Sequence, residues 1–226
     1  MNVLAIIPAY NEQESIVPTV EEFVSARTGC DYLIVNDGSS DATEAVCREH
    51  GYNLVSHPTN LGLTGGFQTG VKYALAHGYD AVIQFDADGQ HVPDHVAQMV
   101  DEMDRAGADI VIGSRFVDEQ KSLSARMIGS RLLTVIIRLT TGQTLTDPTS
   151  GMRLYNRRMM QEFARRFDFG PEPDSVAYLM RHGAKVREVQ VQMRERQAGE
   201  SYLGLARSVS YMARACTSIL LAQWFR

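Results

Sequence analysis

The chain has 226 residues, of which 44% are hydrophobic and 22% charged, with a formal net charge of −5. This size and composition predict a soluble globular protein of one large domain or two small ones. Without a basic footprint, nucleic acid is not an expected partner. The cysteines Cys30, Cys47 and Cys216 show no metal-type spacing and are odd in number, so we expect free thiols in a reducing compartment.

The N-terminus and the hydropathy pattern predict a cytoplasmic protein. Residues 1–8 lack the basic region and cleavage site of a signal peptide and resemble a first strand. No window reaches 18 uninterrupted apolar residues, so no transmembrane helix is predicted.

Short apolar runs alternate with amphipathic segments in the first half, which is typical of a mostly parallel sheet covered by helices. Ser40 and Asp41 suit a helix N-cap, and Pro93 suits a first helical turn. Strands and helices are predicted to alternate, beginning with a strand, over residues 3–7, 14–26, 32–35, 41–50, 53–56, 64–77, 81–85, 93–106 and 110–113.

The sequence changes character after Arg115, because residues 117–131 are polar and basic. No linker rich in Pro, Gly or Ser separates the two halves, so we expect a single domain. The later predicted elements are a helix at 132–141, a strand at 153–155, helices at 157–166 and 174–182, a strand at 185–193 and an amphipathic helix at 203–226.

Two aspartates follow the apolar run at 82–85, in the sequence Asp86-Ala-Asp88-Gly-Gln90-His. Residues i and i+2 of an extended chain point to the same side, so their carboxylates are expected to converge. Two hard oxygen ligands suit Mg²⁺ or Mn²⁺, which share their remaining positions with substrate phosphates. A surface turn is the plain alternative, since Asp-Gly occurs in many loops.

Polar residues also follow the first two predicted strands, where ligands of open α/β sheets bind. Pro8 ends the first strand, Tyr10 offers a ring for stacking a base, and Glu12 offers an acceptor for a ribose or base. Asp37, after the second strand, offers an acceptor for a nucleobase N–H. The alternatives are a strand stop and helix capping, and capping explains Asp41 better than Asp37.

A glycine-rich segment at 60–70 matches neither the dinucleotide nor the P-loop fingerprint, and it serves either ligand approach or packing. Arg115 follows a buried strand, and Arg126, Arg131 and Arg153 lie further along. The guanidinium group matches phosphate geometry, so several arginines near a metal site indicate a phosphate or pyrophosphate ligand.

Six motifs, in order along the chain, resemble those of family 2 glycosyltransferases of GT-A fold. The similarity extends from residue 3 to about residue 202 and is greatest to the polyprenyl-phosphate sugar transferases of the dolichol-phosphate mannose synthase type. The motifs are Pro8-Ala-Tyr-Asn-Glu12, Asn36-Asp-Gly-Ser-Ser-Asp41, Asn60-Leu-Gly62, Asp86-Ala-Asp-Gly-Gln-His91, Gly113-Ser-Arg115 and Asp147-Pro-Thr-Ser-Gly-Met-Arg153.

The resemblance implies a single α/β domain with a Rossmann-like, mostly parallel sheet flanked by helices. It also implies a metal-dependent inverting hexosyltransferase that moves a sugar from a UDP- or GDP-sugar to a polyprenyl phosphate in cell-surface polysaccharide assembly. The expected parts are a nucleotide-sugar-binding half at 1–115, an acceptor half at 116–202 and a C-terminal amphipathic helix at 203–226.

Matching positions receive roles by the same resemblance. The implied sets are Pro8, Tyr10, Glu12, Asp37, Gly62 and Asp86 for the nucleotide-sugar, Asp86, Asp88 and Gln90 for Mg²⁺ or Mn²⁺, and Arg115, Arg126 and Arg153 for the acceptor phosphate or donor diphosphate. The segment from Arg196 to Ser201 resembles the family's Arg-x-x-Gly-x-Ser-Lys motif near the diphosphate. Tyr202 replaces its lysine, and Leu63 stands where many relatives carry a basic residue.

The acceptor decides whether a general base is needed. A hydroxyl acceptor needs one, and Asp174 or Glu172 lies in the region where the family often has it. Each of these carboxylates also suits a helix N-terminus. A phosphate acceptor needs no base, because its second pKa of about 6 leaves it largely ionised at neutral pH. The expected catalytic set is Asp88, Arg115, Arg153 and Asp174.

Three alternatives stay open at this point. The sugar acceptor is a polyprenyl phosphate or a saccharide hydroxyl, and a non-catalytic nucleotide-sugar-binding protein is a further interpretation. The helix at 203–226 carries Trp224 among apolar and basic residues, so it lies peripherally at the inner face of the cell membrane, docks on the domain, or contacts a membrane-protein partner or a second copy.

Overall fold

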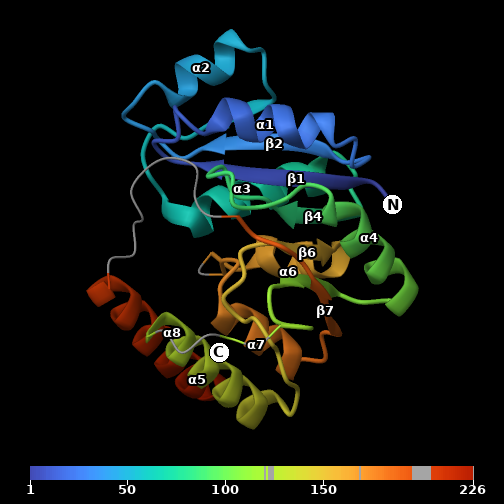
Figure 1. The fold of residues 1–226 in the computed structure, drawn as a ribbon, viewed down its shortest axis with the longest axis vertical. Coiled ribbons are helices and arrows are strands. Elements are labelled where there is room, and N and C mark those ends of the chain that lie inside the picture. The colour runs from blue at the N-terminus through green and yellow to red at the C-terminus, as the bar shows by residue number, and fades with distance from the viewer. Residues whose placement is uncertain (120, 122–124, 168, 195–204, 226) are drawn as a thin grey trace.

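The computed structural model describes residues 1–119, 121, 125–167, 169–194 and 205–225. Strands and helices alternate through the first half (Figure 1). The strands are β1 (Val3–Ala9), β2 (Asp31–Asn36), β3 (Leu54–Ser56), β4 (Ala81–Gln84), β5 (Ile110–Ser114), β6 (Arg153–Asn156) and β7 (Val186–Gln190). The helices are α1 (Ile16–Ser25), α2 (Thr43–Glu49), α3 (Gly62–Ala76), α4 (His95–Ala106), α5 (Ala125–Thr141), α6 (Arg157–Arg165), α7 (Pro173–Arg181) and α8 (Leu205–Phe225).

All seven strands belong to one sheet, in the order β3-β2-β1-β4-β6-β5-β7. The pairs β1·β2, β1·β4, β2·β3 and β5·β7 are parallel, whereas β6 runs antiparallel to both β4 and β5. The prediction of a single α/β domain with a mostly parallel sheet is confirmed. The sequence pattern did not predict that β6 is inserted in the opposite direction.

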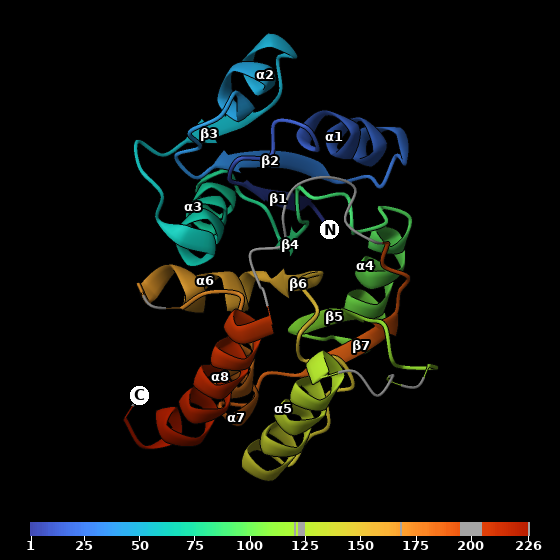
Figure 2. The same ribbon diagram turned by 60° about the vertical axis from the view of Figure 1, so that its left-hand side comes forward.

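The sheet carries an apolar core on each face because successive strand residues point to opposite sides. In β1, Ala5 and Ile7 pack with α1 and α4 residues, whereas Leu4 and Ile6 pack with Phe67 of α3 and with later helices. Figure 2 shows α1 and α4 on one side of the sheet and α3 and α6 on the other. Both strand faces are therefore buried, as in other parallel sheets covered by helices.

Helix α8 packs against α5 and α7. Of its side chains between residues 210 and 221, Ala215, Cys216 and Ile219 are buried in the core, while Leu220 and Leu221 are exposed. The described part of this helix is thus docked on the domain. Within the described ranges, no helix has both the length and the apolar run that crossing a membrane requires.

The largest difference from the predicted elements is the start of α5, which begins at residue 125 rather than 132. Met127, Ser130 and Leu133 are buried on one face of this helix, and Ile137 continues the same face. Arg131 and Arg138 are exposed on the other side of the helix. The segment has a polar and basic sequence although one face of the helix is buried in the core.

Candidate nucleotide-sugar site

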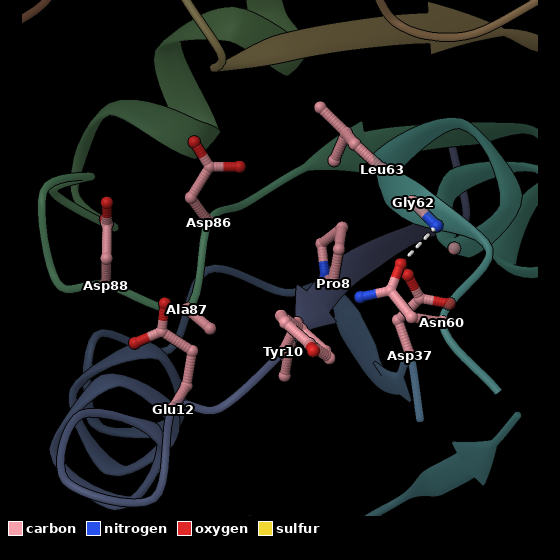
Figure 3. Close-up of a pocket in the computed structure, with 12 residues that line it drawn as sticks. Pro8, Tyr10, Glu12, Asp37, Asn60, Gly62, Leu63, Asp86, Ala87 and Asp88 are labelled. Atoms are coloured by element: carbon pink, nitrogen blue, oxygen red, sulfur yellow. Dashed lines mark hydrogen bonds between the residues drawn. The ribbon is translucent and has the colours of Figure 1, made fainter. Parts of the chain in front are cut away.

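A pocket of about 500 Å³ opens at the carboxyl ends of β1, β2 and β4. It is the place where an open α/β sheet binds its ligands. Figure 3 shows side chains from the three strand ends and from the start of α3 arranged around it. Its lining residues are Pro8, Ala9, Tyr10, Glu12, Asp37, Asn60, Gly62, Leu63, Gly66, Asp86, Ala87 and Asp88.

The loop that carries Tyr10 and Glu12 is held against the loop after β2. Asn11 adopts a left-handed backbone with φ of 56°, which asparagine tolerates better than most residues. Its Oδ1 accepts the N–H of Ser40 at 2.8 Å, and the N–H of Glu12 donates to Thr43 Oγ1 at 2.9 Å. These bonds fix one side of the pocket.

Asp37 is buried at the edge of the pocket, with 5% of its surface exposed. Its Oδ1 accepts hydrogen bonds from the Nδ1–H of His57 at 2.8 Å and from the backbone N–H of Leu61 at 2.9 Å. The Nε2 of His57 lies 2.8 Å from Thr69 Oγ1. His57 was not predicted from the sequence, because a single histidine after a short strand gives no signal of its partners.

Asp86 is oriented by two neighbours that the sequence analysis also missed. Gln84 Nε2 donates to its Oδ1 at 2.9 Å. Its backbone N–H donates to the Nδ1 of buried His91 at 2.9 Å, so a neutral ring carries its proton on Nε2, 3.5 Å from Asp86 Oδ2. A Cβ on Gly151 would lie 2.7 Å from Asp86 Oδ2, so a side chain at this position would displace the Asp86 carboxylate.

The two carboxylates fit a hard divalent ion that shares its coordination with a substrate. The side chains of Asp86 and Asp88 extend from the loop after β4 in the same direction (Figure 3), and Asp86 is 35% exposed. Among the described residues there is no group of three or more His, Cys, Asp or Glu suited to a metal. Mg²⁺ is typically held by one or two carboxylates together with substrate phosphates.

Gln90, predicted as a metal ligand, lies beside the pocket but does not line it. Its Nε2 donates to the carbonyl of Arg194 at 3.3 Å, and its carbonyl accepts the N–H of the same residue at 2.9 Å. Its backbone N–H donates to Asp88 Oδ1 at 3.1 Å. In this arrangement, Gln90 anchors the loop after β4 to the segment after β7.

Arg115 forms a two-point ion pair with buried Asp147, with distances of 2.7 and 2.9 Å. Burial is the largest single influence and raises the pKa of Asp147, but the hydrogen bonds and positive charge of Arg115, together with the hydrogen bond from Thr149, hold this pKa below its ordinary value of 3.8. Glu188 of β7 accepts the N–H groups of Thr146 and Asp147 at 2.7 and 2.9 Å. Burial raises the pKa of Glu188.

Arg153 is not brought to the pocket. It is 2% exposed, and its guanidinium donates to the carbonyls of Pro171 at 2.5 Å and Pro148 at 2.8 Å. It therefore joins the loop before β6 to the loop before α7. A single cationic residue in the sequence does not reveal whether it is buried, so a phosphate role was predicted.

The two carboxylates proposed as general bases both face α8. Asp174, in the first turn of α7, accepts a hydrogen bond from Ser218 at 2.5 Å. Glu172 accepts one from Tyr211. Arg126 is the second residue of α5, but its side chain lies outside the described part of the chain, as do Arg196 and Ser201 entirely.

Replacing Arg115 with methionine is expected to lower the free energy of unfolding by about 3 kcal/mol at pH 7, because it leaves the buried Asp147 carboxylate without its cation. A carboxylate with a lowered pKa contributes stability above its ordinary pKa, and this contribution is lost as pH falls. The deficit of Arg115→Met should therefore be fully present above pH 3.8 and shrink as pH decreases below it, towards the lowered pKa of Asp147. Urea unfolding of the wild type and the variant at several pH values measures this difference in the free energy of unfolding.

Arg48→Met is the matched control, because Arg48 forms an exposed ion pair with Glu44 within α2. Such an exposed pair is screened by solvent and contributes little to the free energy of unfolding. A deficit for Arg115→Met that is equally small, or that is unchanged by pH, would contradict the structural role given to this ion pair.

The chain matches the family model "Glycosyl transferase family 2" over residues 4–163. It is 32% identical over 213 residues to an undecaprenyl-phosphate mannosyltransferase of Micrococcus luteus, covering 89% of this chain and 87% of that protein. A match over most of the chain and an identity at this level show the family.

Solved structures of similar fold have lower identity. Glucosyl-3-phosphoglycerate synthase from Mycobacterium tuberculosis, in complex with Mn²⁺, uridine diphosphate and phosphoglyceric acid, aligns with a TM-score of 0.68 at 18% identity, over 98% of this chain and 78% of that one. The mannosyltransferase PcManGT from Pyrobaculum calidifontis, in complex with GDP-Man and Mn²⁺, aligns at 0.65 and 16%, over 98% and 68%. These likenesses confirm the GT-A fold, and together with the family match they show that the chain belongs to glycosyltransferase family 2 and is a nucleotide-sugar-dependent enzyme.

Proposed function

We propose that this enzyme transfers a sugar, with inversion, from a nucleotide-sugar to a polyprenyl phosphate in a metal-dependent reaction. One observation carries the proposal: a single pocket joins a stacking ring, Tyr10, and a buried base acceptor, Asp37, to the carboxylates of Asp86 and Asp88. A nucleoside diphosphate needs a base-binding pair, here Tyr10 and Asp37, next to a pair of metal ligands, here Asp86 and Asp88.

Within this proposal, the residues of β1 and β2 hold the nucleoside. Tyr10 stacks on the base, Asp37 accepts its N–H, and Glu12 lies where it accepts from the ribose. Pro8 and Gly62 line the pocket walls. The φ of 76° at Gly62 is a left-handed conformation that favours glycine.

Asp86 and Asp88 would hold Mg²⁺ or Mn²⁺, and when bound this ion offsets charge on the departing nucleoside diphosphate. Gln84 and His91 orient Asp86, and outer hydrogen bonds of this kind fix the direction of a metal-binding carboxylate. Gln90 supports the same loop through its hydrogen bonds to Asp88 and Arg194.

Three observations support a phosphate acceptor. Asp174 and Glu172 are both engaged by hydroxyl groups of α8, so neither has the position expected of a base beside the pocket. Arg115 keeps 23% of its side chain exposed while paired with Asp147. The Micrococcus luteus relative is named for an undecaprenyl-phosphate acceptor. Transfer to a saccharide hydroxyl, with Asp174 as base, is the second candidate.

We also propose peripheral contact with an anionic membrane surface through α5 rather than α8. The outward face of α5 carries four exposed aliphatic side chains, and the two other exposed residues between them are Arg131 and Arg138. No acidic residue occurs in α5, although the chain is acidic overall. Aliphatic and basic side chains on one helix face suit a lipid headgroup boundary. The four aliphatic residues are Ile128, Leu132, Val135 and Leu139.

Nucleotide-sugars are expected to raise the melting temperature of the wild type in the presence of Mn²⁺ and much less in its absence. Asp86→Asn removes one of two anionic ligands and should abolish the Mn²⁺-dependent part of the shift. A thermal-shift panel of UDP-, GDP- and dTDP-sugars measures both effects.

Asp94→Asn is the control, since Asp94 lies just before α4, outside the pocket lining. It should retain the full Mn²⁺-dependent shift. If no sugar nucleotide shifts the wild type, or if Asp86→Asn shifts as much as the wild type, the proposed donor site is wrong.

The wild type is expected to float with vesicles of phosphatidylglycerol and phosphatidylcholine in a density gradient, and less with phosphatidylcholine alone. The double variant Leu132→Glu, Leu139→Glu should stay at the bottom, because it places two anions on the α5 face. Val24→Glu, at an equally exposed aliphatic position of α1, should float like the wild type. Absence of flotation with either vesicle type would refute the membrane contact.

A further inference from the structure

The two carboxylate oxygens of Asp37 differ in their surroundings. Oδ1 accepts from His57 Nδ1 and from the N–H of Leu61, and these two bonds use both of its lone pairs. Oδ2 accepts no hydrogen bond from the residues that the structure describes. Because Asp37 lines the pocket, Oδ2 is the oxygen left for a ligand.

A second group of fixed orientation lies beside it. Asn60 Oδ1 accepts the N–H of Gly62 at 2.9 Å, which determines that the amide nitrogen points the other way. Figure 3 shows this nitrogen turned away from Gly62 and towards Tyr10. The loops of Asp37 and Asn60 are in direct contact, since a Cβ on Gly38 would lie 2.7 Å from the backbone nitrogen of Asn60.

This edge of the pocket therefore presents one hydrogen-bond acceptor, Asp37 Oδ2, and one donor group, Asn60 Nδ2. Adenine and cytosine carry an unprotonated ring nitrogen at the centre of their pairing edge, which a carboxylate repels. Uracil and thymine carry one ring N–H between two carbonyl oxygens. Guanine carries a ring N–H and an exocyclic amino group side by side, next to one carbonyl.

Guanine is best read by a carboxylate that accepts with both oxygens, one for each of its adjacent N–H groups. Here Oδ1 is already saturated by His57 and Leu61. The exocyclic amino group of guanine would lose its acceptor, and a buried donor without a partner costs on the order of tenfold in affinity or more. A pyrimidine with a single ring N–H leaves no donor unsatisfied.

From this geometry we infer that the donor base is an imide-bearing pyrimidine, uracil or thymine, read by Asp37 and Asn60, and that His57 is the positioning residue that enforces the choice. The inference rests on the proposed donor site and adds the class of base to it. The fold does not decide the base, because structures of this fold hold either uridine diphosphate or GDP-Man.

His57 acts through Asp37 rather than on the ligand. It is held between Asp37 Oδ1 and Thr69 Oγ1, and its side chain is 9% exposed. A carboxylate only accepts, so the Nδ1–H of His57 must point at Oδ1 and removes it from base recognition. Releasing Oδ1 should therefore make the pocket more tolerant of guanine.

Calorimetric titration of the wild type with UDP, dTDP, GDP and CDP in Mn²⁺ tests the base class. UDP or dTDP should bind at least about tenfold more tightly than GDP and CDP, which corresponds to one unsatisfied polar group. The comparison of UDP with dTDP distinguishes the two pyrimidine sources. GDP binding as tightly as UDP would overturn the inference and leave the proposed donor site intact, whereas no binding by any nucleotide would overturn both.

Two substitutions at one position test the role of His57. Asparagine places its amide nitrogen near the position of Nδ1 and should keep the preference for UDP over GDP. Glutamine reaches the position of Nε2 instead, so His57→Gln should lose most of that preference. An unchanged UDP-to-GDP ratio in His57→Gln, with wild-type ratios in His57→Asn, would overturn the positioning role.

Asn60→Asp supplies a test at an exposed position, where misfolding is not expected. It keeps an acceptor for the N–H of Gly62 and removes the amide donor. UDP affinity should fall by roughly tenfold or more, because a carboxylate then faces a base carbonyl. Unchanged UDP affinity would remove Asn60 from the base-reading pair and overturn that part of the inference.

Discussion

The parallel pairing of β1 with β2 on one side and β4 on the other is the constraint on which the site depends. The register aligns Ala9 with Asn36 and Ile6 with Gln84, so the three strands end at one edge of the sheet. Because parallel strands place their carboxyl ends together, loop residues as far apart in sequence as Tyr10 and Asp88, 78 positions, line one pocket. The buried strand residues carry no reactive groups themselves, yet they fix the position of Asp37 relative to Asp86 and Asp88.

The second half of the enzyme is held by buried charge rather than by strand pairing alone. Asp147 is fixed by Arg115 and by Glu188, and Arg153 joins the two loops that flank β6 and α7. Each of these charged groups makes at least two hydrogen bonds, as buried charges require, although Arg153 Nε has no partner among the described residues. The antiparallel strand β6 brings these loops to the end of the sheet that carries the donor pocket. The loops before β6 and α7 are therefore fixed by buried ionic and polar contacts.

The sequence predicted those parts of the site that depend on local spacing. Asp86 and Asp88 line the pocket because they lie in the loop that follows buried strand β4, and Asp37 lines it because it follows buried strand β2. His57, His91 and Gln84 were missed because their role lies in contacts with other residues that no spacing reveals. For the same reason Arg153 was given a phosphate role, although burial commits its guanidinium to backbone carbonyls. The start of α5 was missed because a half-buried basic helix resembles a polar loop.

The most direct test of the account is to identify the product formed on a lipid phosphate. The purified enzyme would be incubated with sugar nucleotides, Mn²⁺ and undecaprenyl phosphate, and the lipid fraction analysed by mass spectrometry, for the wild type and Asp174→Asn. The account predicts a sugar joined to the lipid phosphate, formed by both proteins at similar rates, because an ionised phosphate needs no base. Transfer only to a saccharide hydroxyl, abolished in Asp174→Asn, would contradict it.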